Sequence, residues 1–139
     1  MRTGDITFGS RMRALFASTV VGVLAGATVL LLANANGGTA TTTDVLNWAL
    51  GGLVVGASVG LVCTEVARLR GELSMVLPAA LVTGPVFTVG VALWAHRADP
   101  WSGEPLYFYG AEALMGLILG SMVAVATRLV LARSVRVDR

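Results

Sequence analysis

The sequence predicts an all-α membrane protein with four transmembrane helices in an antiparallel bundle. Hydrophobic residues make up 55% of the 139 residues, with a further 17 glycines, and only 13% are charged; apolar residues and glycine together supply roughly 45–50% of a soluble domain. The mean hydropathy is +0.78, and long uncharged stretches recur along the chain. This composition excludes disordered, collagen-like and disulfide-rich secreted proteins.

A helix needs about 20 apolar residues to cross the roughly 30 Å hydrocarbon core. The first three spans are predicted at about residues 14–33, 46–66 and 73–95. The fourth, at about 106–127, contains Glu112. Its Leu, Ile, Val and Phe residues favour insertion by about 2.4–4.8 kcal/mol in total, against about 2.5–3.5 kcal/mol for an acid at the helix centre. Because Glu112 lies near one end of the stretch, we expect this span to insert as well.

The arginines predict the orientation, because positive charge near span ends is retained in the cytoplasm. Nine of the arginines fall in the N-terminal segment, the loop after the second span or the tail 128–139, and only Arg97 falls elsewhere. Both termini are therefore expected in the cytoplasm, with outer loops at 34–45 and 96–105. Aromatic residues expected at the outer interface support the same axis: Trp48, Trp94, Trp101, Tyr107 and Tyr109. Arginine without lysine is typical of GC-rich genomes, so we expect a multi-pass protein in the plasma membrane of a bacterium or archaeon.

The first span also has features of a secretory signal, with basic residues before it and a small-x-small site at 33–35. Its apolar core of 20 residues exceeds the roughly 7–15 of a signal peptide, so we expect the span to be retained.

Turn-forming residues mark the ends of the spans. Thr43 or Asp44 is placed to cap the second helix, and Gly71 is placed to end it. Pro85 falls within the third span, where we expect a kink that Thr83 or a neighbouring helix repairs.

Glycines at four-residue spacing form ridges on two spans, and such ridges let helix backbones approach closely in lipid. The ridge of the second span comprises Gly52, Gly56 and Gly60, and that of the fourth comprises Gly116 and Gly120. The two match at an offset of 60 residues, which suggests a duplicated two-helix hairpin. The ridges serve either the packing of one bundle or contacts with another subunit, and the sequence leaves both readings open.

Glu112 is the only ionisable residue well inside a span, and such residues are functional candidates because their burial is costly. One reading is a carboxyl group that locks the bundle by hydrogen bonding. The other is a proton or cation site with Tyr109 and His96 near the outer face. Glu65, near the inner interface, is expected to pair with an arginine. The outer loop around His96 is either a partner or ligand site or part of the aromatic interface belt.

No catalytic or cofactor motif is found. The only histidine, His96, and the only cysteine, Cys63, fall on opposite sides of the membrane in this topology, which excludes a metal site, disulfide or catalytic pair built from both in one chain. We expect no cofactor, no metal and no enzymatic activity. The basic pI of about 9.3 does not indicate nucleic-acid binding, since the arginines are explained by topology; of these, Arg68, Arg70, Arg128 and Arg133 are candidates for contact with lipid headgroups.

Two functions follow as expectations. The first is a non-enzymatic accessory subunit that packs through its glycine-rich faces in a homo-oligomer or a larger membrane complex. The second is a small ion or solute channel or transporter that uses Glu112. The expected partners are the lipid bilayer and either a second copy of the chain or another membrane protein.

Overall fold

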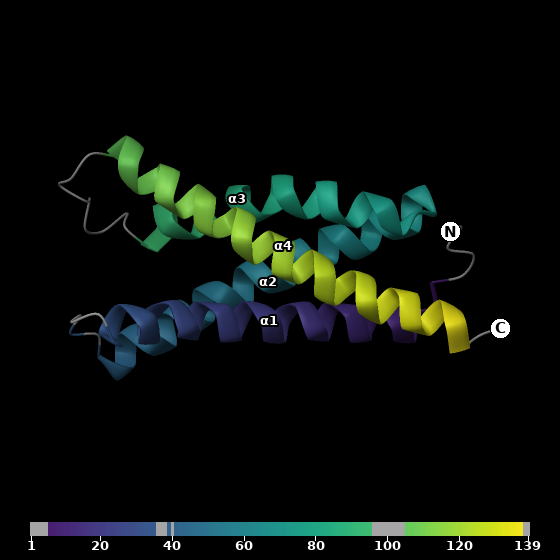
Figure 1. The fold of residues 1–139 in the computed structure, drawn as a ribbon, viewed down its shortest axis with the longest axis horizontal. Helices are drawn as coiled ribbons and strands as arrows, with labels where there is room; N and C mark the ends of the chain where they lie inside the picture. Colours follow the sequence, from purple (N-terminus) through teal and green to yellow (C-terminus); the bar gives the residue numbers. More distant parts are fainter. Residues whose placement is uncertain (1–5, 36–38, 40, 96–104, 138–139) are drawn as a thin grey trace.

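The described part of the chain forms four long helices. The computed structural model describes residues 6–35, 39, 41–95 and 105–137. Figure 1 shows α1 (Phe8–Ala35), α2 (Thr42–Arg70), α3 (Val76–Ala95) and α4 (Pro105–Val137), with the short 3₁₀ helix η1 (Leu73–Met75) between α2 and α3. The prediction of an all-helical protein is confirmed.

Among the described residues, three helical stretches are long and apolar enough to cross a membrane: Thr42–Arg70, Leu73–Trp94 and Tyr109–Ser134. They overlap the second, third and fourth predicted spans. The first predicted span lies within α1, but part of it falls outside the residues whose side chains the structure describes. The structure is thus consistent with a membrane protein.

Three of the described helices, α1, α2 and α4, extend beyond their predicted spans, whereas α3 lies within its own. α4 has 33 residues and continues through most of the predicted tail, to Val137. Neither glycine nor proline occurs between Gly120 and Val137, so no residue there interrupts the helix. α4 starts at Pro105, a position where the missing N–H of proline costs nothing.

The second helix is capped at both ends by local chemistry. Its N-cap is Thr41, in place of the predicted Thr43 or Asp44, and Asp44 completes a capping box. The amide of Thr41 donates to the Asp44 carboxylate at 2.8 Å, and the amide of Asp44 donates to the Thr41 hydroxyl at 3.3 Å. At the other end Gly71 has φ 65°, the left-handed conformation that glycine adopts without steric cost. Gly71 ends the helix as predicted.

α3 continues through Pro85. A proline here removes the amide that would bond the carbonyl of Leu81. The hydroxyl of Thr83 donates to the carbonyl of Ala79 at 2.7 Å, so Thr83, one of the two alternatives expected to repair the break, does not bond the carbonyl of Leu81. α4 packs against α3 at Pro85, where the backbone of Gly116 approaches closely.

The helices pack as two pairs, α1 with α2 and α3 with α4, and the pairs meet chiefly through α1 with α4 and α2 with α3. In Figure 1 the start of α1 and the end of α4 lie at the same end of the molecule as η1. We call this the basic end, because arginines gather there. The buried core contains residues from all four helices and η1 and is built largely from small and β-branched side chains: Ala14, Val55, Val59, Cys63, Ala67, Leu73, Val76, Ala80, Val123, Ala124 and Leu131.

Candidate functional site

The predicted ridge on α2 packs directly against α1. A Cβ atom added to Gly52 would lie 2.1 Å from the carbonyl oxygen of Gly22, and one added to Gly56 would lie 2.6 Å from the carbonyl oxygen of Ser18. Since real Cβ contacts essentially never fall below 3.0 Å, only glycine fits at this approach. We call Gly22, Gly52 and Gly56 the first glycine seam.

The ridge on α4 packs against α3 in the same manner. A Cβ atom on Gly116 would lie 2.6 Å from the Cα of Pro85, and one on Gly120 would lie 2.5 Å from the carbonyl oxygen of Ala80. Gly84 faces both glycines, and its own added Cβ would lie 2.2 Å from the carbonyl oxygen of Gly116. We call Gly84, Gly116 and Gly120 the second glycine seam.

The two seams share one contact pattern. In each, one glycine of the first helix faces two glycines that are four residues apart on the second: Gly22 faces Gly52 and Gly56, and Gly84 faces Gly116 and Gly120. On α1, Gly26 adds a further close contact with Gly52. The contacts therefore match Gly52 with Gly116, whereas the sequence offset of 60 matches Gly56 with Gly116. The two correspondences differ by one helical turn on the second helix.

Gly60 lies next to a buried cluster of hydroxyl groups. A Cβ atom on Gly60 would lie 2.4 Å from the Cβ of Ser18. The hydroxyl of Ser18 is 2.8 Å from that of Thr127 on α4, and it lies 2.7 Å from the carbonyl of Ala14, to which it donates. Both Ser18 and Thr127 are fully buried. Sequence reasoning missed this link between the two helix pairs, because a serine and a threonine 109 positions apart carry no signal that they meet.

An ion cluster ties α1 to α2 at the basic end. The carboxylate of Glu65 pairs with Arg68, at 2.8 Å, and with Arg11 of α1. The expected pairing of Glu65 with an arginine is confirmed. The contact with Arg11 was not predicted, since the sequence explained that residue by topology alone.

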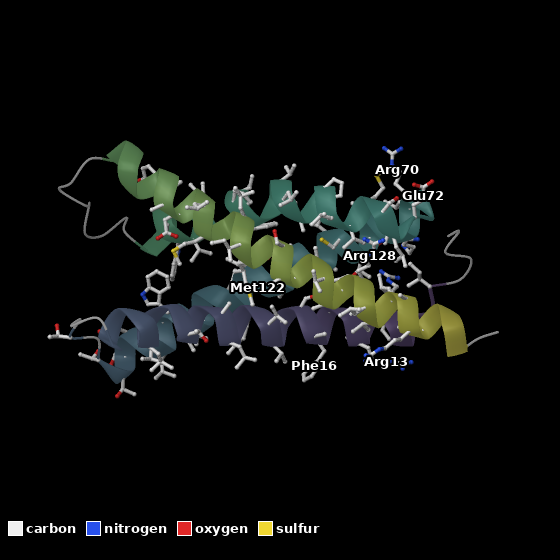
Figure 2. The ribbon with its side chains drawn as sticks, viewed as in Figure 1. Arg13, Phe16, Arg70, Glu72, Met122 and Arg128 are labelled. Atoms are coloured by element: carbon white, nitrogen blue, oxygen red, sulfur yellow. The ribbon has the colours of Figure 1, made fainter. Side chains whose placement is uncertain are left out.

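The other predicted inner arginines differ from Arg68 in their ion pairing. Arg70, Arg128 and Arg133 are exposed, as are Arg68 and, on α1, Arg13. Within the described part of the chain, ion pairs with carboxylates are formed by Arg11 and Arg68 and by none of the other four. Figure 2 shows Arg13, Arg70 and Arg128 on different sides of the basic end.

Glu112 and Tyr109 lie three residues apart in the first turns of α4, and both are half-buried. Each makes at least one interaction with its surroundings. His96, the third residue of the predicted ion or ligand site, lies outside the described residues, as do Trp101 and the rest of the loop 96–104. Among the described residues, no three His, Cys, Asp or Glu side chains form a group that could hold a metal ion.

Comparisons with protein-family models, with curated proteins and with solved structures found no match to this chain.

Proposed function

We propose that this chain is a non-enzymatic integral membrane subunit that assembles with a second copy of itself or with another membrane protein. Its four helices cross the membrane as an antiparallel bundle, with both termini in the cytoplasm. The membrane is the plasma membrane of a bacterium or archaeon. The bundle is a duplicated hairpin, in which each half is closed by one glycine seam.

The observation that carries the proposal is the apolar exterior. Every long helix exposes large hydrophobic side chains, including Phe16 on α1, Leu61 on α2, Val86 on α3 and Met122 on α4. In Figure 2 the side chain of Phe16 points away from the other helices. A water-soluble bundle would cover such a surface with polar residues. This apolar exterior is stable in contact with lipid or with the apolar surface of another subunit.

The interior supports a packing role rather than a polar pathway. The buried polar side chains in the described residues are Ser10, Ser18, Thr64 and Thr127. Ser10, Ser18 and Thr64 donate to backbone carbonyls close by on the same chain, and Thr127 bonds Ser18. Hydroxyls satisfied in this way tie helices together and leave little capacity to coordinate a passing ion.

The glycine seams are occupied within the chain, which favours docking of a further subunit elsewhere. The backbones at Gly52, Gly56, Gly116 and Gly120 already touch a neighbouring helix. A second chain cannot use these glycines while the hairpins are closed. Assembly is therefore assigned to the outward apolar faces, and the seams serve to give each hairpin its shape.

The test is the mass of the protein after purification in a mild detergent. One chain has a mass of 14.3 kDa. Native mass spectrometry is expected to show two or more copies, or one copy with another membrane protein at fixed stoichiometry. A species that contains only one chain, at every protein concentration tested and after extraction in several mild detergents, would contradict the proposal.

A second candidate function is a small channel or transporter, favoured by the half-buried Glu112 and Tyr109 on one stretch of α4. A carboxylate that binds a proton or cation loses this capacity in the neutral Glu112→Gln variant, whereas a packing carboxyl keeps most of its hydrogen bonds. The test is proton or cation flux into liposomes for both proteins at matched content. Flux that the substitution abolishes would support the channel; the subunit proposal expects neither protein to exceed empty liposomes.

A further inference from the structure

The arginines at the basic end divide into two groups. Arg11 and Arg68 share the carboxylate of Glu65. The nearby Glu72 accepts a hydrogen bond from the hydroxyl of Ser74 at 3.0 Å. The exposed arginines that form no ion pair with any described carboxylate are Arg13, Arg70, Arg128 and Arg133. This end therefore presents an excess of positive charge that the described chain does not neutralise.

Each of three of these arginines has a large exposed apolar neighbour on its own helix. Phe16, three residues after Arg13, is 72% exposed, and Leu69, beside Arg70, is 71% exposed. Leu129, which follows Arg128, is 54% exposed. Such pairs mark the depth at which acyl chains give way to headgroups, because the apolar side chain remains in lipid while the flexible arginine reaches the phosphate layer.

The four arginines come from three helices. Arg13 is on α1, Arg70 ends α2, and Arg128 and Arg133 are one to two turns apart on α4. Figure 2 places Arg13 and Arg70 on opposite sides of the basic end, with Arg128 between them. This distribution suits many small ligands arranged around the molecule better than one docked protein.

We propose that Arg13, Arg70, Arg128 and Arg133 form a belt that binds the headgroups of anionic phospholipids. A guanidinium donates two parallel hydrogen bonds to a phosphate, and a lipid with net negative charge has no cation of its own to compete for that phosphate. About 1 kcal/mol per arginine near an anionic surface corresponds to about a fivefold preference for each residue. The belt rests on the proposed membrane location of the chain.

The experiment uses the purified full chain in mild detergent with an equimolar mixture of phosphatidylglycerol and phosphatidylcholine of identical acyl chains. Native mass spectrometry counts the lipids that remain bound. The wild type is expected to retain phosphatidylglycerol at least fivefold over phosphatidylcholine. Arg70→Gln and Arg128→Gln are each expected to lower that ratio by up to about fivefold.

Arg68→Gln is the matched control, since it removes the same charge from the same end but from a residue engaged by Glu65. It is expected to change the ratio less than twofold. A fall as large as that of Arg128→Gln would overturn the assignment to the four arginines that form no ion pair with a described carboxylate. Equal retention of the two lipids by the wild type would overturn the belt and leave the membrane location intact. A bound acidic protein that disappears in Arg128→Gln would replace the lipid as occupant and overturn the proposal. A chain that stays soluble without detergent and retains neither lipid would instead refute the proposed function.

Discussion

Replacing Gly116 by alanine tests the second glycine seam with the smallest possible change. The new Cβ would lie 2.6 Å from the Cα of Pro85 and 2.7 Å from the carbonyl oxygen of Gly84, whereas ordinary contact begins at 3.4 Å. Both neighbours are backbone atoms, so α3 and α4 must move apart by several tenths of an ångström along the seam. Overpacking of this kind costs about 1–3 kcal/mol.

Gly110 on the same helix provides the control, because nothing lies within 4 Å of an added Cβ there. Alanine gains about 1 kcal/mol of helix propensity over glycine at either position, and the difference between the two variants therefore isolates the packing cost. We expect Gly116→Ala to be less stable than Gly110→Ala by about 1–3 kcal/mol. The assay is unfolding in mixed micelles of a mild detergent and dodecyl sulfate, followed by tryptophan fluorescence. Equal stability of the two variants would refute the close approach of α3 and α4.

Three further predictions concern the polar contacts and the α2 terminus, all measured by the same unfolding assay. Thr127→Val removes the buried hydrogen bond to Ser18 and is expected to lower the free energy of unfolding by roughly 1 kcal/mol. The control is Ser121→Ala, which should change it little because the Ser121 hydroxyl bonds its own helix. Equal effects of the two substitutions would contradict the link between the helix pairs. Glu65→Gln removes the carboxylate that pairs with two arginines. The free energy of unfolding is expected to fall by roughly 1 kcal/mol at low salt and by less at high salt, since the site is partly exposed. A fall that salt does not alter would argue against an electrostatic origin. Gly71→Ala places a side chain at φ 65° and should cost about 1–2 kcal/mol, so an unchanged stability would mean that the helix ends differently.

The sequence was sufficient to predict the helices because hydrophobic length is a property of each segment alone. The glycine spacing likewise predicted that α2 and α4 carry faces suited to close approach. It did not predict which helix each face contacts, since a ridge of small residues fits any neighbour. The contacts with Gly22 and Gly84 arise from tertiary packing. By these contacts Gly116 corresponds to Gly52, one helical turn away from Gly56, its counterpart in the sequence alignment.

The misplaced cap of α2 and the missed contact of Arg11 have physical causes. Thr41, Thr42 and Thr43 are all suitable caps, and the choice depends on Asp44, which reaches back three residues to Thr41 to complete the capping box. Arg11 was explained by the positive-inside rule, which concerns the side of the membrane and is silent about ion pairs. Its contact with Glu65 depends on the crossing of α1 and α2, which no local pattern encodes.

Accessibility of introduced cysteines in intact cells tests the central claim, a membrane-embedded bundle with its basic end in the cytoplasm. Thr43 lies at the start of α2 and Ser74 lies in η1, just after the end of α2. Both are exposed. The native Cys63 is fully buried and gives little background labelling. A membrane-impermeant maleimide is expected to label Thr43→Cys in intact cells and to label Ser74→Cys only after the cells are permeabilised. Labelling of Ser74→Cys in intact cells would contradict the account, because it would place the basic end outside or the chain out of the membrane.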